Sequence, residues 1–226
     1  MPPRLSVIIP TLNEAAAIRP TLDSLQALRG RGAEVIVTDG GSADGTPALA
    51  ALLADRVLAA PKGRARQMNS GAEAAGGEVL LFLHADTRLP ERADGMVLDG
   101  LAAGGRVWGR FDVHIEGRPW MLRVVAFCMN RRSRWTGVAT GDQAMFVRRE
   151  AFWALGGFPV QPLMEDIELS KRLRRLGPPL CLRERAATSG RRWESRGVWR
   201  TIWLMWRLRW LYWRGVAAEK LAEAYR

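Results

Sequence analysis

A short apolar run that stops at an acid and a glycine-rich loop is the feature that most constrains this fold. Residues 34–46 read E-V-I-V-T-D-G-G-S-A-D-G-T, so a β-branched run ends at Asp39 and a helix-like segment follows the loop. A strand ending in a carboxylate above such a turn is a common way to hold a nucleotide, because glycines allow close approach to the backbone. Two similar runs end at Pro10 and Asp86.

Strand-like and helix-like patterns alternate along the first part of the chain. We expect strands at residues 5–9, 34–38, 56–59 and 79–83, and helices at 14–28, 45–53, 64–75 and 90–103. Asn13 is expected to cap the first helix. The alternation predicts an α/β fold with a mainly parallel sheet flanked by helices and right-handed crossovers. Ligands of such sheets lie beyond the carboxyl ends of the strands, where Pro10, Asp39 and Asp86 fall.

The pattern changes after Gly105. We expect a half-exposed strand at 107–115, a helix at 120–134, a strand at 141–147, and helices at 150–155 and 165–176. The predicted organisation is one domain over residues 1–193, with a nucleotide-binding half (1–104) and an acceptor half (105–193), and a helical tail over residues 194–226.

The tail carries tryptophans at helical spacing. They are Trp199, Trp203, Trp206, Trp210 and Trp213. On a helix they form one stripe, beside a second stripe of Arg200, Arg207 and Arg214. Three interpretations stay open: an amphipathic helix at a membrane interface, where Trp suits the headgroup boundary and Arg meets anionic lipid, a helix packed on the domain, or a helical homodimer contact.

Composition limits the partners. The formal net charge is +11, which points to a polyanion, an anionic lipid or a phosphate-rich substrate. No base-reading motif is present, so nucleic acid is not an expected partner. No stretch long enough to cross a bilayer is apolar and free of charge, so no membrane span is expected. Cys128 and Cys181 fit no metal or redox spacing and are predicted to be reduced, buried thiols.

Six segments together resemble the family 2 glycosyltransferases of the GT-A (Rossmann-like) fold. In chain order they are S-V-I-I-P-T-L-N-E (6–14), V-T-D-G-G-S-A-D-G-T (37–46), L-F-L-H-A-D (81–86), G-D-Q (141–143), E-D (165–166) and R-R-W (191–193). Each is weak alone, and their order and spacing make the set specific. The resemblance implies that a sugar is transferred from a nucleotide-sugar with inversion at the anomeric carbon.

The resemblance also implies roles in binding the donor. It places Pro10, Thr11, Glu14, Asp39, Arg66 and Ala85 around the nucleotide, with Asp39 at the base or ribose. Ser42 and Asp44 are better explained as turn and cap residues. Lys62 and Arg64 precede or open a helix and suit a pyrophosphate or a base carbonyl, with a solvated surface position as the alternative.

His84-Ala85-Asp86 occupies the place of the family's Asp-x-Asp motif, which holds Mg or Mn against the donor diphosphate. The first acid is replaced by His84, while Asp86 keeps the last position. One carboxylate, diphosphate oxygens and waters can hold Mg²⁺, and an imidazole would favour Mn²⁺. We therefore expect a divalent metal at Asp86 and His84.

The remaining segments imply the acceptor side. By resemblance Asp166 is the base that removes the acceptor's proton, and Glu165 orients or binds the acceptor, although two acids also suit a helix N-terminus. Asp142 is expected near the sugar. Arg192 and Trp193 match the end of a Gln-x-x-Arg-Trp motif that meets diphosphate and acceptor, while Ser189 replaces the Gln, which favours single transfer over processivity.

The leading prediction is a small bacterial inverting glycosyltransferase that uses a UDP-sugar and a lipid-linked or apolar acceptor at the cytoplasmic face of a membrane. The acceptor prediction rests on the Trp/Arg tail. The alternative is a membrane-surface scaffold on a degenerate transferase fold, for which His84 is the main support. The joint presence of Asp39, Asp86 and Asp166 favours the enzyme.

Overall fold

A computed structural model describes residues 4–225, and its centre is one eight-stranded sheet with the order β3-β2-β1-β4-β7-β6-β8-β5. The strands are β1 (Leu5–Thr11), β2 (Glu34–Asp39), β3 (Arg56–Ala59), β4 (Val79–Phe82), β5 (Thr87–Arg88), β6 (Trp108–Glu116), β7 (Phe146–Arg148) and β8 (Leu180–Ser189). The first four strands pair in parallel, as do β6 and β8. The pairs β4–β7, β6–β7 and β5–β8 are antiparallel. The expected mainly parallel α/β sheet is confirmed.

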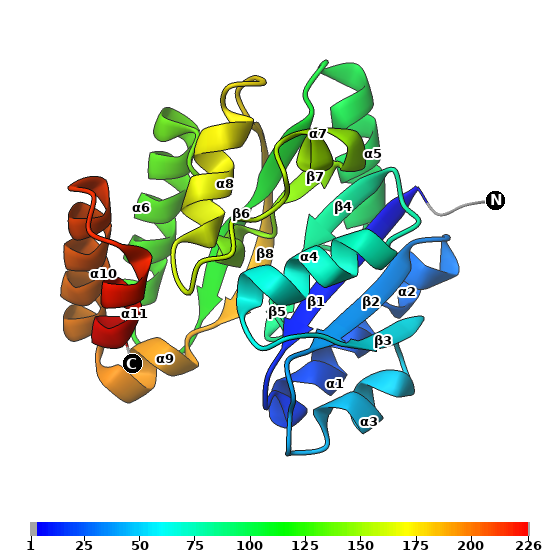
Figure 1. Cartoon of the computed structure of the whole chain (residues 1–226), viewed down its shortest axis with the longest axis horizontal. Coiled ribbons are helices and arrows are strands. Elements are labelled where there is room, and N and C mark those ends of the chain that lie inside the picture. The colour runs from blue at the N-terminus through cyan, green and yellow to red at the C-terminus, as the bar shows by residue number, and fades with distance from the viewer. Residues whose placement is uncertain (1–3, 226) are drawn as a thin grey trace.

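Helices cover both faces of the sheet (Figure 1). Hydrophobic contacts place α1 (Ala15–Ser24), α2 (Gln26–Gly30), α3 (Thr46–Ala51) and α5 (Ala93–Ala103) on one face. They place α4 (Arg64–Ala74), α7 (Arg149–Ala154) and α8 (Glu165–Leu173) on the other. Four more helices gather at the side away from the N-terminus: α6 (Met121–Thr136), α9 (Arg191–Arg196), α10 (Val198–Trp213) and α11 (Ala218–Tyr225).

The apolar strand runs form two cores because successive side chains of a strand point to opposite faces. Val7 and Ile9 belong to the cluster beneath α1, whereas Ile8 belongs to the cluster beneath α4. Gly71 lets α4 approach the sheet, since a Cβ atom there would lie 2.5 Å from the Ile8 side chain. This close packing fixes the start of α4 at the carboxyl ends of β1 and β4.

The start of α1 differs from expectation. Asn13 does not cap the helix: it has a positive φ of 55°, and its side chain accepts a hydrogen bond from the Ala43 N–H. The free N–H groups at the helix start are instead satisfied from the next loop, by Asp44 to Ala15 and Thr46 to Glu14. The capping role expected of Asp44 is thus directed at two helices, since it also accepts from the Thr46 N–H.

The second half departs further. Residues 141–143 form a 3-10 turn, η1 (Gly141–Gln143), so the predicted strand is reduced to β7. The strands β5 and β8 were not expected. The strand predicted as half-exposed, β6, is mostly buried because it lies between β7 and β8. Both cysteines are free, as predicted, but neither is buried: Cys128 is exposed and Cys181 is partly exposed.

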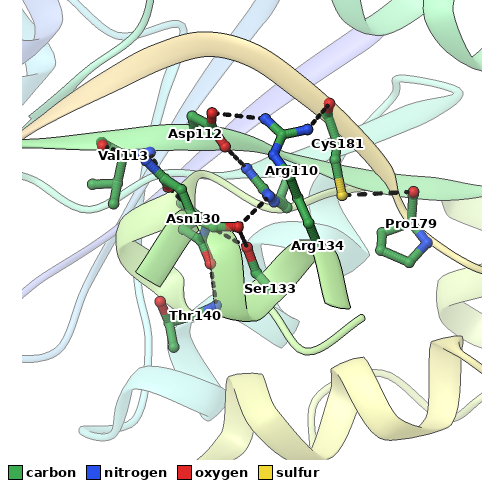
Figure 2. A network of polar contacts seen from close by, with 10 residues as sticks. Arg110, Asp112, Val113, Asn130, Ser133, Arg134, Thr140, Pro179 and Cys181 are labelled. Atoms are coloured by element: carbon green, nitrogen blue, oxygen red, sulfur yellow. Dashed lines mark hydrogen bonds and ion pairs between the residues drawn. The ribbon is translucent and has the colours of Figure 1, made fainter. Parts of the chain in front are cut away.

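Buried charges explain why β6 looked half-exposed in sequence. Arg110 is fully buried and forms an ion pair with Asp112, whose other oxygen accepts from Arg134 of α6 at 2.7 Å (Figure 2). The side chain of Asn130 accepts a hydrogen bond from the Val113 N–H at 2.8 Å and donates one to the Val113 carbonyl at 3.0 Å. One carboxylate therefore pairs with two guanidinium groups and ties α6 to the sheet.

Removing that carboxylate should destabilise the fold. In Asp112→Asn the buried Arg110 loses its counter-charge, so we expect the free energy of unfolding to fall by about 3–5 kcal/mol. Chemical denaturation measures it. The matched control is Asp23→Asn, which removes the exposed Arg19–Asp23 pair and should cost less than about 1 kcal/mol. Equal effects of the two substitutions would contradict the assignment.

Candidate active site

A cavity of about 660 Å³ opens at the carboxyl ends of β1 and β4. Its walls come from the loops after these strands, the starts of α4 and α8, η1, and the segment from the end of β8 into α9. The tail helices α10 and α11 close one side with Thr201, Met205, Arg209 and Tyr225. Of the site residues predicted from the sequence, all but Asp39 and Arg66 line this cavity.

The end of β1 supplies one wall through Pro10, Thr11 and Glu14. Gln67 of α4 braces this wall, because its amide nitrogen donates to the carbonyls of Thr11 at 2.7 Å and Thr38 at 2.8 Å. Gln67 is not among the site residues expected from the sequence. It joins the ends of β1 and β2 and so holds the edge from which the cavity opens.

Asp39 lies beside the cavity wall, but its carboxylate oxygens accept hydrogen bonds from the loop that follows β2 and from Thr11. They accept hydrogen bonds from the Gly41 and Ser42 N–H groups and from the Thr11 and Ser42 hydroxyls. Burial works to raise the pKa of Asp39, and these donors, led by Ser42, outweigh it and hold the pKa below its usual value. Arg66 is exposed and does not line the cavity, whereas Arg64, Gly63 and Lys62 do.

Arg191 bridges two carboxylates across the cavity. Its Nη2 lies 2.9 Å from Glu14 Oε2 and 3.3 Å from Asp86 Oδ2. The Glu14 hydrogen bond is the main cause that raises the pKa of Arg191. The Gln-x-x-Arg-Trp motif points only to Arg192 and Trp193. A role for Arg191 was therefore not predicted, although its guanidinium contacts Asp86.

His84 turns toward η1. Its Nδ1 lies 3.3 Å from Asp142 Oδ1, and its Nε2 faces Gly141, where a Cβ atom would lie 2.3 Å away. Among the described residues, Nε2 has no hydrogen-bond partner. Although burial opposes it, the contact with His84 is the main cause that keeps the pKa of Asp142 low, assisted by Arg64 and Arg192. Both imidazole nitrogens are thus directed at the turn that carries Asp142.

Asp166 lies in the first turn of α8. Its Oδ2 accepts from the Gly141 N–H at 2.8 Å, and its Oδ1 from its neighbour Ile167 N–H at 2.7 Å. Met164, the residue just before α8, has a left-handed φ of 66° that turns the chain into the helix. Two backbone donors therefore hold the carboxylate at the cavity wall.

Burial raises the pKa of Asp166 to about 6, and the negative charge of Glu165 adds to this shift. The two backbone hydrogen bonds and Arg64 oppose it. Arg64 also pairs with Glu165 at 3.4 Å and so links α4 to α8. A carboxyl group with a pKa near neutrality suits proton transfer, because it is ionised yet still basic at physiological pH.

Gln143 holds η1 from beneath. Its amide nitrogen donates to Ser133 Oγ at 3.0 Å and to Asn130 Oδ1 at 3.4 Å, and its oxygen accepts from the Thr140 N–H at 3.3 Å. The buried network of Figure 2 thereby reaches the turn whose Gly141 N–H contacts Asp166. Gln143 was present in the G-D-Q segment, but its positioning role could not be found without β6 and α6.

The far end of the cavity is more apolar. Leu163, Met164 and Met205 line it with Trp193 and Tyr225. The Arg192 guanidinium stacks 4.5 Å from the Tyr225 ring centre, which joins α9 to α11. The predicted acceptor residues Arg192 and Trp193 therefore face a chamber whose other walls come from α10 and α11.

A divalent metal fits this site only with a substrate. Within residues 4–225, no group of three or more His, Cys, Asp or Glu side chains could hold a metal ion. Asp86 offers a hard carboxylate oxygen at the cavity wall, and the guanidinium between Asp86 and Glu14 shows that this position attracts a cation. Mg²⁺ is commonly held by one or two carboxylates and substrate phosphates, so this donor set fits when a diphosphate supplies the rest.

The family comparison matches residues 6–156 to the model described as Glycosyl transferase family 2. A probable glycosyltransferase, YdaM of Bacillus subtilis, is 29% identical, with 89% of this chain and 54% of that protein aligned. A PGL/p-HBAD biosynthesis glycosyltransferase of Mycobacterium bovis is 38% identical over 96 residues, or 39% of this chain and 38% of the relative. The chain thus spans about half or less of these relatives.

Solved structures share the fold. Staphylococcus aureus TarS 1–349 with UDP-GlcNAc superposes with a TM-score of 0.67 at 17% identity, covering 82% of this chain and 58% of TarS. The mannosyltransferase PcManGT of Pyrobaculum calidifontis, in complex with GDP-Man and Mn²⁺, gives 0.64 at 23% identity, covering 92% and 61%. At these identities the likeness establishes the fold alone.

The order of the strands, the residues around the cavity and the family match agree on one assignment. The sequence resemblance is confirmed, and the named relatives support an enzyme over the non-catalytic scaffold. The chain belongs to glycosyl transferase family 2 and has the GT-A fold.

Proposed function

We propose that this enzyme moves a sugar from a nucleotide-sugar, with a UDP-sugar favoured, to a lipid-linked or apolar acceptor with inversion at the anomeric carbon. The observation that carries the proposal is Asp166, a carboxylate held at the cavity wall by two backbone donors, with its pKa raised to about 6. Asp86 lines the same cavity. A base and a diphosphate-binding end therefore share one cavity.

In the proposed reaction, Asp166 accepts the proton of the acceptor hydroxyl. That oxygen forms a bond to the anomeric carbon while the bond from this carbon to the diphosphate oxygen breaks, and the electron pair leaves with the nucleoside diphosphate. Glu165 maintains the basicity of Asp166 through its negative charge, and Arg64 keeps Glu165 in place. Asp142 faces the sugar from η1, where His84 orients it.

The donor would lie between the β1 wall and Asp86. Pro10, Thr11 and Glu14 border the nucleotide, and Ala85 lies beside it. When bound, Mg²⁺ or Mn²⁺ at Asp86 would neutralise the charge that develops on the leaving diphosphate. PcManGT and a Mycobacterium tuberculosis glucosyl-3-phosphoglycerate synthase, which are similar in fold, were solved with Mn²⁺. Arg192 supplies further positive charge.

Asp39 and Arg66 do not line the cavity, so a contact of either residue with the nucleotide base would require a loop arrangement other than this one.

The acceptor would enter from the apolar end. Leu163, Met164, Met205 and Trp193 offer hydrocarbon and aromatic surface, and Arg209 offers a cation for a phosphate. These residues suit an acceptor with an apolar body, and with such an acceptor the enzyme would act beside a membrane, on its cytoplasmic face. A homodimer stays a prediction.

Asp166→Asn tests the base. The amide keeps the shape but cannot accept the proton, so we expect kcat for sugar transfer to fall by about 10²–10⁴-fold. Product formation from a UDP-sugar is measured against Glu168→Gln, an acid on the same helix that pairs with Lys171 and Arg172 outside the cavity. Undiminished transfer by Asp166→Asn would refute the mechanism.

The pH dependence follows from the raised pKa. Activity needs the ionised carboxylate, so log kcat should climb as the pH rises through about 6 and level off above it. Replacing the charge that contributes to the shift, in Glu165→Gln, should move this limb to lower pH. A limb centred near pH 4, the ordinary range of an aspartate, would show that Asp166 is not perturbed as described.

Arg191→Gln tests the diphosphate end. Arg191 pairs with Asp86 and Glu14 in the ligand-free protein, so its removal should tighten the binding of Mn²⁺ severalfold when no nucleotide is present. When UDP and Mn²⁺ are both present, the native protein should be stabilised most in the wild type. Titration calorimetry and thermal shift report both effects. The control is Arg88→Gln. Arg88 lies two residues after Asp86 and forms an exposed ion pair with Glu116, and its replacement should change neither Mn²⁺ binding nor the stabilisation by UDP.

A further inference from the structure

The tail helix α10 has two faces with different partners. Thr201 and Leu208 are buried, and Leu204 and Leu211 pack with Met164 and Ile167 at the start of α8. On this inner side Thr201, Met205 and Arg209 line the cavity. The predicted packing of the tail on the domain therefore accounts for the leucines, and leaves the tryptophans unexplained.

The outer face is a row of exposed indoles. Trp199, Trp203, Trp206, Trp210 and Trp213 are between 55% and 76% exposed. Arginines stack on them, with the guanidinium of Arg207 5.3 Å from the Trp203 ring centre and that of Arg214 5.4 Å from Trp210. The sequence of α10 contains no Asp or Glu. Five large apolar rings in water, rimmed by cations, constitute an interaction surface and not a solvated one.

The neighbouring helix α6 repeats this chemistry. Its inner residues Leu122 and Ala126 pack in one cluster with Val198, the first residue of α10. Its outer side exposes Val124, Phe127 and Trp135, and Trp120 just before the helix is 71% exposed. Arg131 lies over the rings of both Phe127 and Trp135, at 5.7 and 4.8 Å. This helix also contains no acid.

The charge pattern decides the partner. A second copy of the chain would place arginines of α6 and α10 against arginines, because a symmetric contact pairs the same surface with itself. Neither helix offers a carboxylate in return. A surface that is both apolar and negatively charged satisfies the indoles and the guanidinium groups together, and the interface of a bilayer with anionic lipids has both properties. Among residues 4–225, no helix is long and apolar enough to cross a membrane, so α10 would lie along the interface.

We propose that the exposed sides of α6 and α10 form a docking surface for anionic membranes. The inference rests on the proposed transferase in one respect. Because the inner side of α10 is a cavity wall, docking holds the apolar end of the cavity next to the bilayer, where the reacting end of a lipid-linked acceptor can reach Asp166. The substrate class is then an acceptor whose lipid remains in the membrane during transfer.

Vesicle flotation of the full chain tests the surface. The wild type should float with vesicles that contain phosphatidylglycerol in phosphatidylcholine and much less with pure phosphatidylcholine, and salt should weaken binding. The double variant Trp206→Gln, Trp210→Gln should lower the partition coefficient by at least about tenfold, since it removes two interfacial rings. The control is Trp153→Gln, an exposed tryptophan of α7, which should float as the wild type.

Other readouts separate the outcomes. UDP-dependent thermal stabilisation, measured on the same samples, should be equal in all three proteins, because neither Trp206 nor Trp210 lines the cavity. Flotation that is lost while UDP binding persists supports the docking surface. Failure of the wild type to float, equal flotation of the double variant, a dimer that the double substitution dissociates, or retention by DNA in preference to vesicles would each overturn the proposal. Loss of UDP binding in the wild type would instead contradict the proposed donor.

Discussion

The pairing of β5 with the end of β8 is the constraint on which the site depends. Thr87 lies opposite Thr188, and their hydroxyls are hydrogen-bonded at 2.9 Å. The Ser189 N–H donates to the Asp86 carbonyl at 3.2 Å. A two-residue strand thus brings Arg191 to Asp86 from far along the chain. Without it, Asp86 and Glu14 would lose the guanidinium that faces them.

The first half of the fold was predictable because its signals are local. Strands β1, β2 and β4 are continuous apolar runs with both faces buried, and the helices between them keep an apolar face. In β6, by contrast, Arg110 and Asp112 looked like solvent-facing residues. Arg110 is buried and Asp112 is partly buried because each neutralises the other, which only the three-dimensional arrangement reveals. The charged run Arg183–Arg185 hid β8 for another reason: these residues are exposed and lie beside a register shift in β6 between Phe111 and Asp112.

The candidate site follows the same division. Short motifs located the acids that line the cavity, since strand ends and helix starts can be recognised from neighbouring residues. They could not reveal the positioning roles of Arg191 and Gln67, whose partners are distant in sequence. The ion pairs Arg64–Glu165 and Arg191–Asp86 each join an early segment to a late one. The charges that line the cavity therefore also hold its two sides together, and a diphosphate that binds there competes with contacts of the protein itself.

The close approach of His84 to Gly141 limits which side chains these two positions can carry together. The imidazole fills the space that a side chain at position 141 would need, 2.3 Å from its Nε2. Restoring the acid of an Asp-x-Asp motif at position 84 would vacate that space and remove the partner of Asp142 at once. A residue larger than glycine should therefore be accepted at position 141 only when position 84 carries a side chain shorter than histidine.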